Sequence, residues 1–133
     1  MKVVIMAGGR GTRISELFPD IPKPLIPIEG VPVLERELVS LRNQGFKEFI
    51  MTVSYMGDKI MNYFGDGSKL GVSIQYYNEV TPLGNAGALF ILREQLGDEP
   101  FLLLNADAVF DVDFNRMIRF HQEHGGLVTL FTH

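Results

Sequence analysis

The chain has 133 residues and a mass of 14.9 kDa, which suits one domain and is too short for two. Its hydrophobic content of 46% and charged content of 21% exclude the disordered and low-complexity classes. A net charge of −4 excludes a global basic field for nucleic acid, and the absence of cysteine excludes disulfides, zinc–thiolate sites and thiol catalysis. No apolar run approaches the ~20 residues of a membrane span, and no signal peptide is recognisable. We therefore expect a cytoplasmic protein without a nucleic-acid or membrane partner.

The first half of the chain predicts two strands and two helices around a proline-rich stretch. A short apolar run that ends at Gly8 is typical of a buried strand, and five prolines in fifteen residues exclude a helix. Apolar residues with helical spacing predict a helix that begins near Pro32 and ends at Gly45. In order, the expected elements are a strand over Lys2–Ala7, extended chain over Phe18–Pro32, a helix over Val33–Gln44, a strand over Lys47–Tyr55 and a helix over Asp58–Phe64.

The second half continues the same alternation. Residues rich in β-branched and aromatic side chains predict strands, and glycines after the amphipathic stretches mark the ends of helices. Asp113 is expected to cap the last helix. In order, the expected elements are a strand over Val72–Tyr77, a helix over Asn85–Leu96, a strand over Pro100–Leu104, a helix over Asp113–His124 and a fifth strand over Leu127–Thr132.

Alternating strands and helices predict the α/β fold class, as a Rossmann-like three-layer sandwich with a mostly parallel sheet. Residues 1–133 then form a single domain, and its ligands are expected at the carboxyl ends of the strands. The last expected strand runs to His133 without a turn or cap. We take this as the sign of a truncated chain, the N-terminal portion of a longer catalytic domain, whose open apolar edge would suit a homo-oligomeric partner.

Glycines and arginines follow the first strand, in the order Ala7-Gly8-Gly9-Arg10-Gly11-Thr12-Arg13. Three glycines in four positions let the backbone approach a bulky anion, and the arginines add positive charge, so a polyphosphate is the expected ligand. The stretch lacks the Gly-Lys-Ser/Thr of a Walker A loop and the third glycine of the dinucleotide fingerprint. The alternative is a tight turn from strand to helix.

Two further residues suit phosphate chemistry. Lys23 lies between Pro22 and Pro24, whose fixed φ angles lower the entropy cost of directing its ammonium group at a phosphate. Asp107 follows a buried strand and suits Mg²⁺, which takes one or two protein carboxylates and fills its coordination shell with phosphate oxygens and water. The alternatives are a solvated lysine and an aspartate that caps a turn or helix.

Four ordered motifs resemble the sugar-1-phosphate nucleotidyltransferases, and most closely the mannose-1-phosphate guanylyltransferase-like group. The likeness runs from Met1 to about Phe120. The motifs are Ala7-Gly8-Gly9-x-Gly11-Thr12-Arg13, Pro22-Lys23-Pro24-Leu25-x-Pro27-Ile28, Pro82-Leu83-Gly84-x-Ala86-Gly87-Ala88 and Asn105-x-Asp107.

This resemblance implies a reaction in which a nucleoside triphosphate and a sugar 1-phosphate give a nucleotide-sugar and pyrophosphate. It also implies that Ala7, Gly8, Gly9, Gly11 and Thr12 wrap the triphosphate and that Arg13 binds the leaving pyrophosphate. Lys23 would stabilise charge around the α-phosphate, and Asp107 would hold the Mg²⁺ cofactor. Gly84 and Asn85 belong to the nucleotide-binding set, although Asn85 stands where threonine is common.

Glu79 gives an indication of the base. In the family that the chain resembles, the segment before the Leu-Gly motif approaches the base edge. A carboxylate can accept hydrogen bonds from both N1–H and N2–H₂ of guanine, whereas uracil and thymine present one donor between two carbonyls. We therefore expect GTP, with Gly84 allowing the base to approach closely. The alternative is an ordinary surface glutamate.

Other interpretations stay open at this stage. Asp111-Val112-Asp113 has the Asp-x-Asp form that metal-dependent glycosyltransferases use, and a non-catalytic nucleotide-binding subunit is a third candidate. His121 and His124 are expected to be a surface pair and not a metal site. The sequence does not identify the sugar of the sugar 1-phosphate, so mannose and a heptose are both candidates. The residues that match the family's first half alone are expected to bind nucleotide weakly and to turn over negligibly.

Overall fold

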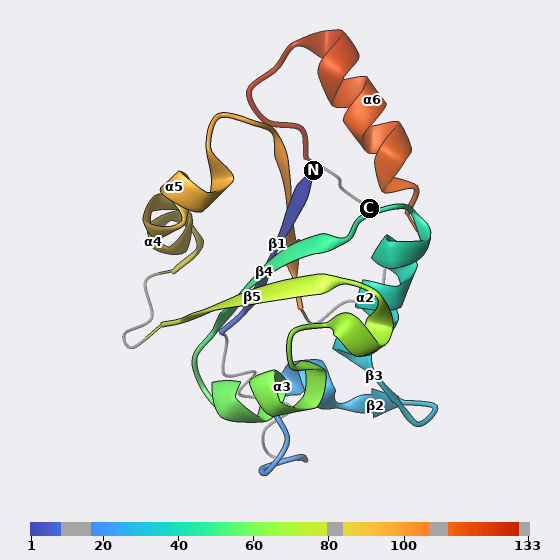
Figure 1. The fold of residues 1–133 in the computed structure, drawn as a ribbon, viewed down its shortest axis with the longest axis vertical. Coiled ribbons are helices and arrows are strands. Elements are labelled where there is room, and N and C mark those ends of the chain that lie inside the picture. The colour runs from blue at the N-terminus through green and yellow to red at the C-terminus, as the bar shows by residue number, and fades with distance from the viewer. Residues whose placement is uncertain (9–16, 80–83, 107–111, 131–133) are drawn as a thin grey trace.

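A parallel sheet of four strands forms the centre of the protein in the computed structural model (Figure 1), which describes residues 1–8, 17–79, 84–106 and 112–130. The order of the strands across the sheet is β5-β4-β1-β6, and each adjacent pair is parallel. The α/β class with a mostly parallel sheet is thereby confirmed. The strands are β1 (Lys2–Ala7), β4 (Glu48–Val53), β5 (Ser73–Asn78) and β6 (Phe101–Asn105).

The strand order places a switch point beside β1. The chain passes from β1 to β4 and then β5 on one side, and afterwards returns to pair β6 with the other side of β1. In open α/β sheets, ligands bind outside the carboxyl ends of the strands at such a point. We call the end of the sheet formed by the carboxyl ends of these four strands the carboxyl edge.

The larger core lies on the face of the sheet that carries α2 (Val33–Asn43) and α3 (Gly57–Phe64). The helical spacing of Leu34, Leu38 and Leu41 puts all three on the buried side of α2, where each is fully buried. Pro32 precedes the first turn of α2, as expected. The two helices pack against alternate residues of β1 and β4, so the predicted α/β layering holds on this face.

The opposite face carries α4 (Gly84–Ile91) and α5 (Arg93–Leu96), which cover Val4 and Ile50. The sequence predicts one helix over Asn85–Leu96, and that prediction is wrong in one respect: the helix is interrupted at Leu92, with φ −81° and ψ 0°. Leu92 is 1% exposed and belongs to the small core on this face. Leu92 is buried like the apolar residues of the two helices, so the apolar spacing is that of one continuous helix. The spacing therefore does not reveal the interruption.

The proline-rich stretch is free of α-helix, as expected. It contains a short 3₁₀ helix, η1 (Lys23–Leu25), followed by the two-residue strands β2 (Pro27–Ile28) and β3 (Val31–Pro32), which pair antiparallel. A second 3₁₀ helix, η2 (Ser68–Leu70), precedes β5.

The last helix, α6 (Phe114–His124), is confirmed together with its cap. The Asp113 carboxylate accepts a hydrogen bond from the Arg116 backbone N–H at 3.2 Å, which satisfies one of the free donors of the first turn. Gly125, with φ +63°, ends the helix in the left-handed conformation that favours glycine.

The fifth strand predicted over Leu127–Thr132 is absent from residues 127–130, and residues 131–133 lie outside the described part of the chain. Leu127 is 99% exposed and Leu130 is 80% exposed. The apolar pattern of this segment suits a buried strand, but a strand also needs a neighbour with which to pair, and local sequence does not provide one. None of the helices in the described ranges is long and apolar enough to cross a membrane.

Candidate functional site

Two of the segments predicted to bind phosphate and metal begin at the carboxyl edge. Register pairs Ala7 of β1 with Val53 of β4, and Val53 with Asn78 of β5. On the other side of β1, Met6 pairs with Asn105, and the Ala106 backbone N–H donates to the Met6 carbonyl at 3.2 Å. The polar segments that follow these strands therefore leave the sheet from neighbouring positions.

Two of those segments carry the predicted phosphate and metal residues. Gly8 and Ala106 are the last described residues before residues 9–16 and 107–111. They follow adjacent strands, with the switch point between them. Ala7 itself is buried in the main core. Five of the predicted residues, Gly9, Gly11, Thr12, Arg13 and Asp107, lie outside the described residues, so their convergence stays a prediction.

Glu79 contacts the carboxyl ends of two adjacent strands, β4 and β1. Its backbone N–H donates to the Val53 carbonyl at 2.7 Å, which extends the ladder between β4 and β5 by one bond. Its side chain turns toward β1: a methyl group on Gly8 would lie 3.0 Å from Oε2 of Glu79 and 3.4 Å from Cβ of Ser54. Only glycine at position 8 leaves this space open. The structure thus places Gly8 next to Glu79, a proximity that the sequence does not predict.

The environment of Glu79 is unusual for a carboxylate. The residue is 9% exposed, which contradicts the alternative of an ordinary surface glutamate. Burial raises the pKa of its carboxyl above the ordinary value, because desolvation disfavours the charged form. A buried carboxyl with a raised pKa at the carboxyl edge of an α/β sheet is a candidate for ligand recognition.

A tight turn connects β4 to α3 beside Glu79. Met56 adopts the left-handed conformation, with φ 54° and ψ 29°, which is unfavourable for a side chain of its kind. A methyl group on Gly57 would lie 2.9 Å from Cγ2 of Val53, so this position also requires glycine. The turn brings the start of α3 directly against the carboxyl edge. Neither Ser54 nor Met56 belongs to a motif, so the sequence alone does not distinguish them as site residues.

Lys23 begins η1 on the same face as the larger core. Pro22 and Pro24 on either side of it are buried, and Leu25 packs against the main core. The Lys23 carbonyl accepts a hydrogen bond from the Ile26 N–H at 3.2 Å. The lysine is therefore on a fixed piece of backbone, as the flanking prolines predict. That its ammonium group faces a phosphate stays a prediction.

Gly84 and Asn85 form the start of α4. Gly84 has φ +70°, a conformation that favours glycine, and a methyl group there would meet no atom within 4 Å of the described chain. The open space fits the expected approach of a flat ligand. Of Asn85 the structure gives the helical backbone alone.

The alternative Asp-x-Asp metal site loses one of its acids. The Asp113 carboxylate caps α6, whereas Asp111 lies outside the described residues. His121 Nδ1 lies 2.8 Å from Oγ1 of Thr129, and the His124 ring stacks on Phe120. Within the described ranges, no cluster of three or more His, Asp or Glu side chains could hold a metal ion. Asp107, the expected ligand of Mg²⁺, lies outside the described residues, so the magnesium site stays a prediction.

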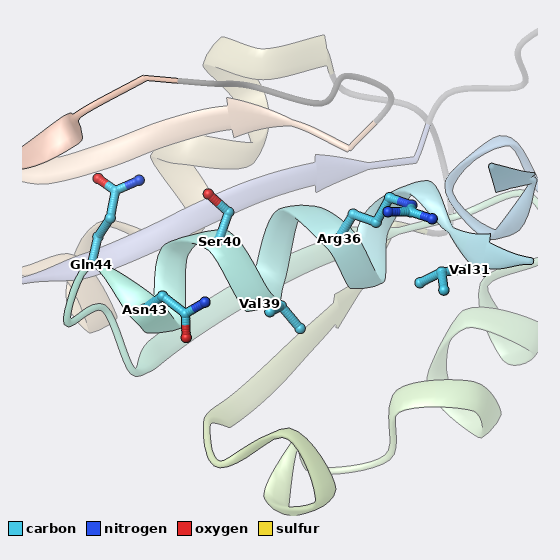
Figure 2. Close-up of a pocket in the computed structure, with 6 residues that line it drawn as sticks. All are labelled: Val31, Arg36, Val39, Ser40, Asn43 and Gln44. Carbon is cyan, nitrogen blue, oxygen red and sulfur yellow. The ribbon is translucent and has the colours of Figure 1, made fainter. Parts of the chain in front are cut away.

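A separate hollow lies along the outer side of α2. It has a volume of about 520 Å³ and is lined by Val31, Arg36, Val39, Ser40, Asn43 and Gln44 (Figure 2). None of the predicted site residues lines it. The Gln44 amide is engaged with the backbone of Val112 and Phe114, and the Arg36 guanidinium with the Ile28 carbonyl. These two side chains line the hollow and are already engaged in hydrogen bonds that hold the fold together.

The fold and the carboxyl edge together define a doubly wound α/β protein with a glycine-ended central strand at its switch point. Comparison with known proteins gives the particular group. The chain belongs to the nucleotidyl transferase family, whose sequence model matches residues 2–133.

Named relatives and solved structures agree with this assignment. The chain is 36% identical over 134 residues to probable mannose-1-phosphate guanylyltransferase 1 of Oryza sativa subsp. japonica, covering 98% of this chain and 37% of that protein. It is 37% identical over 143 residues to a UTP–glucose-1-phosphate uridylyltransferase of Synechocystis, covering 99% and 37%. Among structures, HddC from Yersinia pseudotuberculosis in complex with GMP-PN superposes with a TM-score of 0.80 at 32% identity, covering 90% of this chain and 53% of that one.

These relatives are enzymes by name, and the resemblance to sugar-1-phosphate nucleotidyltransferases is thereby confirmed. The chain spans a little over a third of the length of the curated relatives it matches and about half of the matched structure. One relative is named a guanylyltransferase and the other a uridylyltransferase, at nearly equal identity. Membership of the family therefore does not identify the base of the nucleotide.

Proposed function

We propose that this chain is the nucleotide-binding portion of a sugar-1-phosphate nucleotidyltransferase that uses GTP and mannose 1-phosphate. The product would be a nucleotide-sugar, with release of pyrophosphate. The observation that carries the proposal is the buried carboxyl of Glu79, held against Gly8 at the end of the central strand.

The choice of GTP follows from the chemistry of that carboxyl. Ionised Glu79 has acceptors only, and guanine presents two adjacent donors, N1–H and N2–H₂. A uracil ring presents one N–H between two carbonyl oxygens, and a carboxylate would repel those oxygens. The open space at Gly84 supports the approach of a purine from the side of α4. The structure of HddC with GMP-PN supports the same choice.

The proposed reaction requires little covalent chemistry from the protein. The attacking phosphate oxygen of a sugar 1-phosphate is already anionic, so no general base or covalent nucleophile is required. Catalysis then depends on holding the two phosphates in line and on neutralising charge at the α-phosphate and the departing pyrophosphate. The absence of cysteine is compatible with such a mechanism.

Named residues would share that task. The backbone of Gly8, Gly9 and Gly11 would wrap the triphosphate, while Arg13 would bind the leaving pyrophosphate and Lys23 the charge around the α-phosphate. Asp107 would hold Mg²⁺, which when bound neutralises phosphate charge. Gly8 and Ala106 leave adjacent strands, which supports a common location for these groups.

Substitution Glu79→Gln tests the base assignment. A glutamine amide has one acceptor and one donor group, which matches the imide edge of uracil and mismatches the two donors of guanine. We expect GTP binding to weaken roughly tenfold to a hundredfold, the range for loss of a charge-assisted hydrogen bond, and UTP binding to strengthen. The measurement is a titration of each nucleotide with Mg²⁺, followed by calorimetry or by NMR where affinity is low.

A matched control is Glu48→Gln, which removes an exposed carboxylate at the other end of β4. It should leave the ratio of GTP to UTP affinity unchanged. An unchanged ratio in Glu79→Gln as well would contradict the base assignment. Pyrophosphate release on adding mannose 1-phosphate, measured on the whole protein that contains this portion, then distinguishes the enzyme from a subunit that binds nucleotide without turnover.

A further inference from the structure

The segment that carries Lys23 is tied to the body of the protein at two points by cationic side chains. On one side of Lys23, Nζ of Lys59 donates a hydrogen bond to the Asp20 carbonyl. On the other side, Arg36 donates from Nε at 3.1 Å and from Nη2 at 2.5 Å to the Ile28 carbonyl. Lys59 belongs to α3 and Arg36 to α2, so each tie joins the segment to a different helix.

The segment needs such ties because its own backbone provides few. Its prolines have no N–H to donate, and its outer parts, residues 17–20 and 27–30, are exposed. Around Lys23 the Leu25 N–H donates to the Pro22 carbonyl at 2.9 Å and the Ile26 N–H to the Lys23 carbonyl at 3.2 Å. Further bonds are few: the Ile21 N–H donates to the Phe18 carbonyl at 3.3 Å, the Val33 N–H to the Ile26 carbonyl at 3.1 Å, and β2 pairs with β3. These bonds shape the turn around Lys23, whose buried Pro22 and Pro24 anchor it on the protein, and the ties from the helices hold its exposed flanks.

The helix that carries Lys59 is itself fixed to the carboxyl edge. The Gly57 N–H donates to the Ser54 carbonyl at 3.0 Å, and Gly57 packs against Val53, the last residue of β4. Ile60, next to Lys59, is fully buried in the main core. In Figure 1, α3 lies at the end of the molecule toward which the carboxyl ends of β1 and β4 point. Lys59 therefore joins the Lys23 segment to the part of the sheet where the phosphates are expected.

We infer that Lys59 is a positioning residue: by holding the Asp20 carbonyl it places the proline-rich segment so that Lys23 reaches the phosphates of the bound nucleotide. Arg36 supports the same segment from its far side. This inference rests on the proposed role of Lys23. Lys59 acts through Lys23 and touches no phosphate, so it is not a catalytic residue.

The inference makes a specific claim about energetic coupling. If Lys59 acts only by placing Lys23, its removal should matter only while Lys23 is present. If Lys59 instead bound a phosphate directly, the losses from the two residues would add. The variants are Lys59→Met, which keeps the aliphatic stem and removes the donor, Lys23→Met and the double substitution.

The experiment is a titration of each variant with GTP and Mg²⁺, with guanosine as a probe that lacks phosphates. We expect Lys59→Met to weaken GTP binding roughly threefold to tenfold, in line with one hydrogen bond, and to leave guanosine binding unchanged. In the Lys23→Met background the same substitution should have no further effect. Lys59→Arg, which restores a donor, should recover most of the affinity.

Lys47→Met is the matched control, because it removes an exposed lysine at the opposite end of β4 and changes net charge equally. It separates the effect of position from that of charge and should bind GTP like the unsubstituted protein. Additive losses, or unchanged GTP binding in Lys59→Met while Lys23→Met binds weakly, would overturn the inference and leave the proposed function standing. Unchanged binding in Lys23→Met would instead overturn the proposed role of Lys23, and this inference with it.

Discussion

Polar side chains at two ends of the molecule are used in opposite ways. At the junction of α2 and α6, the side-chain amide of Gln44 donates to the Val112 carbonyl at 2.9 Å and accepts from the Phe114 N–H at 2.8 Å. The backbone carbonyl of Gln44 accepts a hydrogen bond from Nδ2 of Asn115 at 2.8 Å. We call these residues, with Asp113, the α2–α6 junction. These polar groups, part-buried or exposed, bond to protein partners and so join α6 to the end of α2.

The carboxyl edge shows the reverse. Burial raises the pKa of Glu79, and Met56 is held in a left-handed conformation. Gly8, which has no side chain, leaves open the space beside the Glu79 carboxyl. None of these features stabilises the fold. Substitutions at the α2–α6 junction should therefore lower stability and spare nucleotide binding. Substitutions at the carboxyl edge should weaken nucleotide binding without lowering stability.

The largest effect is expected from Asp107→Asn. Loss of a metal-binding carboxylate should lower Mg²⁺-dependent activity by about a hundredfold or more, as for loss of one group that stabilises transition-state charge. The measurement is the rate of pyrophosphate release with GTP and mannose 1-phosphate, as a function of Mg²⁺ concentration, by the whole enzyme of which this chain is the proposed nucleotide-binding portion. Asp111→Asn is the control and should remain close to the unsubstituted rate. Equal losses in both variants would favour the Asp-x-Asp alternative.

Gln44→Ala should give the next largest effect, this time on stability. It leaves the Val112 carbonyl and the Phe114 N–H without their partner, so we expect a loss of about 2–3 kcal/mol in the free energy of unfolding. Urea denaturation measures this, with the exposed Gln122→Ala on α6 as the control. Nucleotide affinity should be unchanged at a temperature where the variant is folded. Weaker nucleotide binding by the folded variant would break the distinction between the two regions.

Gly8→Ala tests the carboxyl edge with a smaller change. The added methyl group would lie 3.0 Å from Oε2 of Glu79, so the carboxyl must move. We expect GTP affinity to fall roughly tenfold, the equivalent of one displaced hydrogen-bonding group. Gly126→Ala is a suitable control, since its nearest neighbour would be at 3.7 Å. GTP affinity equal to that of the control would show that the position of the Glu79 carboxyl is unimportant.

The smallest effect is the dependence of stability on pH in Glu79→Gln. Because burial raises the pKa of Glu79 in the folded state, its contribution to stability is present below the unfolded pKa and is lost as pH rises through the folded value. Glutamine does not titrate, so the variant should be more stable than the original protein at pH 7. The difference in Tm should vanish near pH 4. A lower Tm for the variant at pH 7 would mean that the ionised carboxyl stabilises the fold.

Local sequence predicts most of the fold because the relevant interactions are local. Apolar spacing in α2, the cap at Asp113 and the glycine after α6 each act within a few residues. The interruption at Leu92 and the missing strand at 127–130 depend on partners elsewhere in the chain, which such patterns do not contain.

The candidate site shows the same limit. Glycine-rich and proline-flanked motifs, which are recognisable on their own, identify Gly8 and Lys23, whereas the family resemblance identifies Glu79 from its place before the Leu-Gly motif. The contact of Glu79 with Gly8 spans more than half the chain and depends on the order of the strands. Lys59 has no motif around it, and only its bond to the Asp20 carbonyl distinguishes it from other exposed lysines.

The central claim is that the segments after β1 and β6 bind one triphosphate and its metal ion at the carboxyl edge. Mn²⁺ in place of Mg²⁺, added with GTP, broadens the NMR signals of amides close to the ion. The account requires the strongest broadening at Gly8 and Ala106, with the Gln44 and Asn115 amides little affected. Broadening centred on Gln44 and Asn115, or absent from one of Gly8 and Ala106, would contradict it.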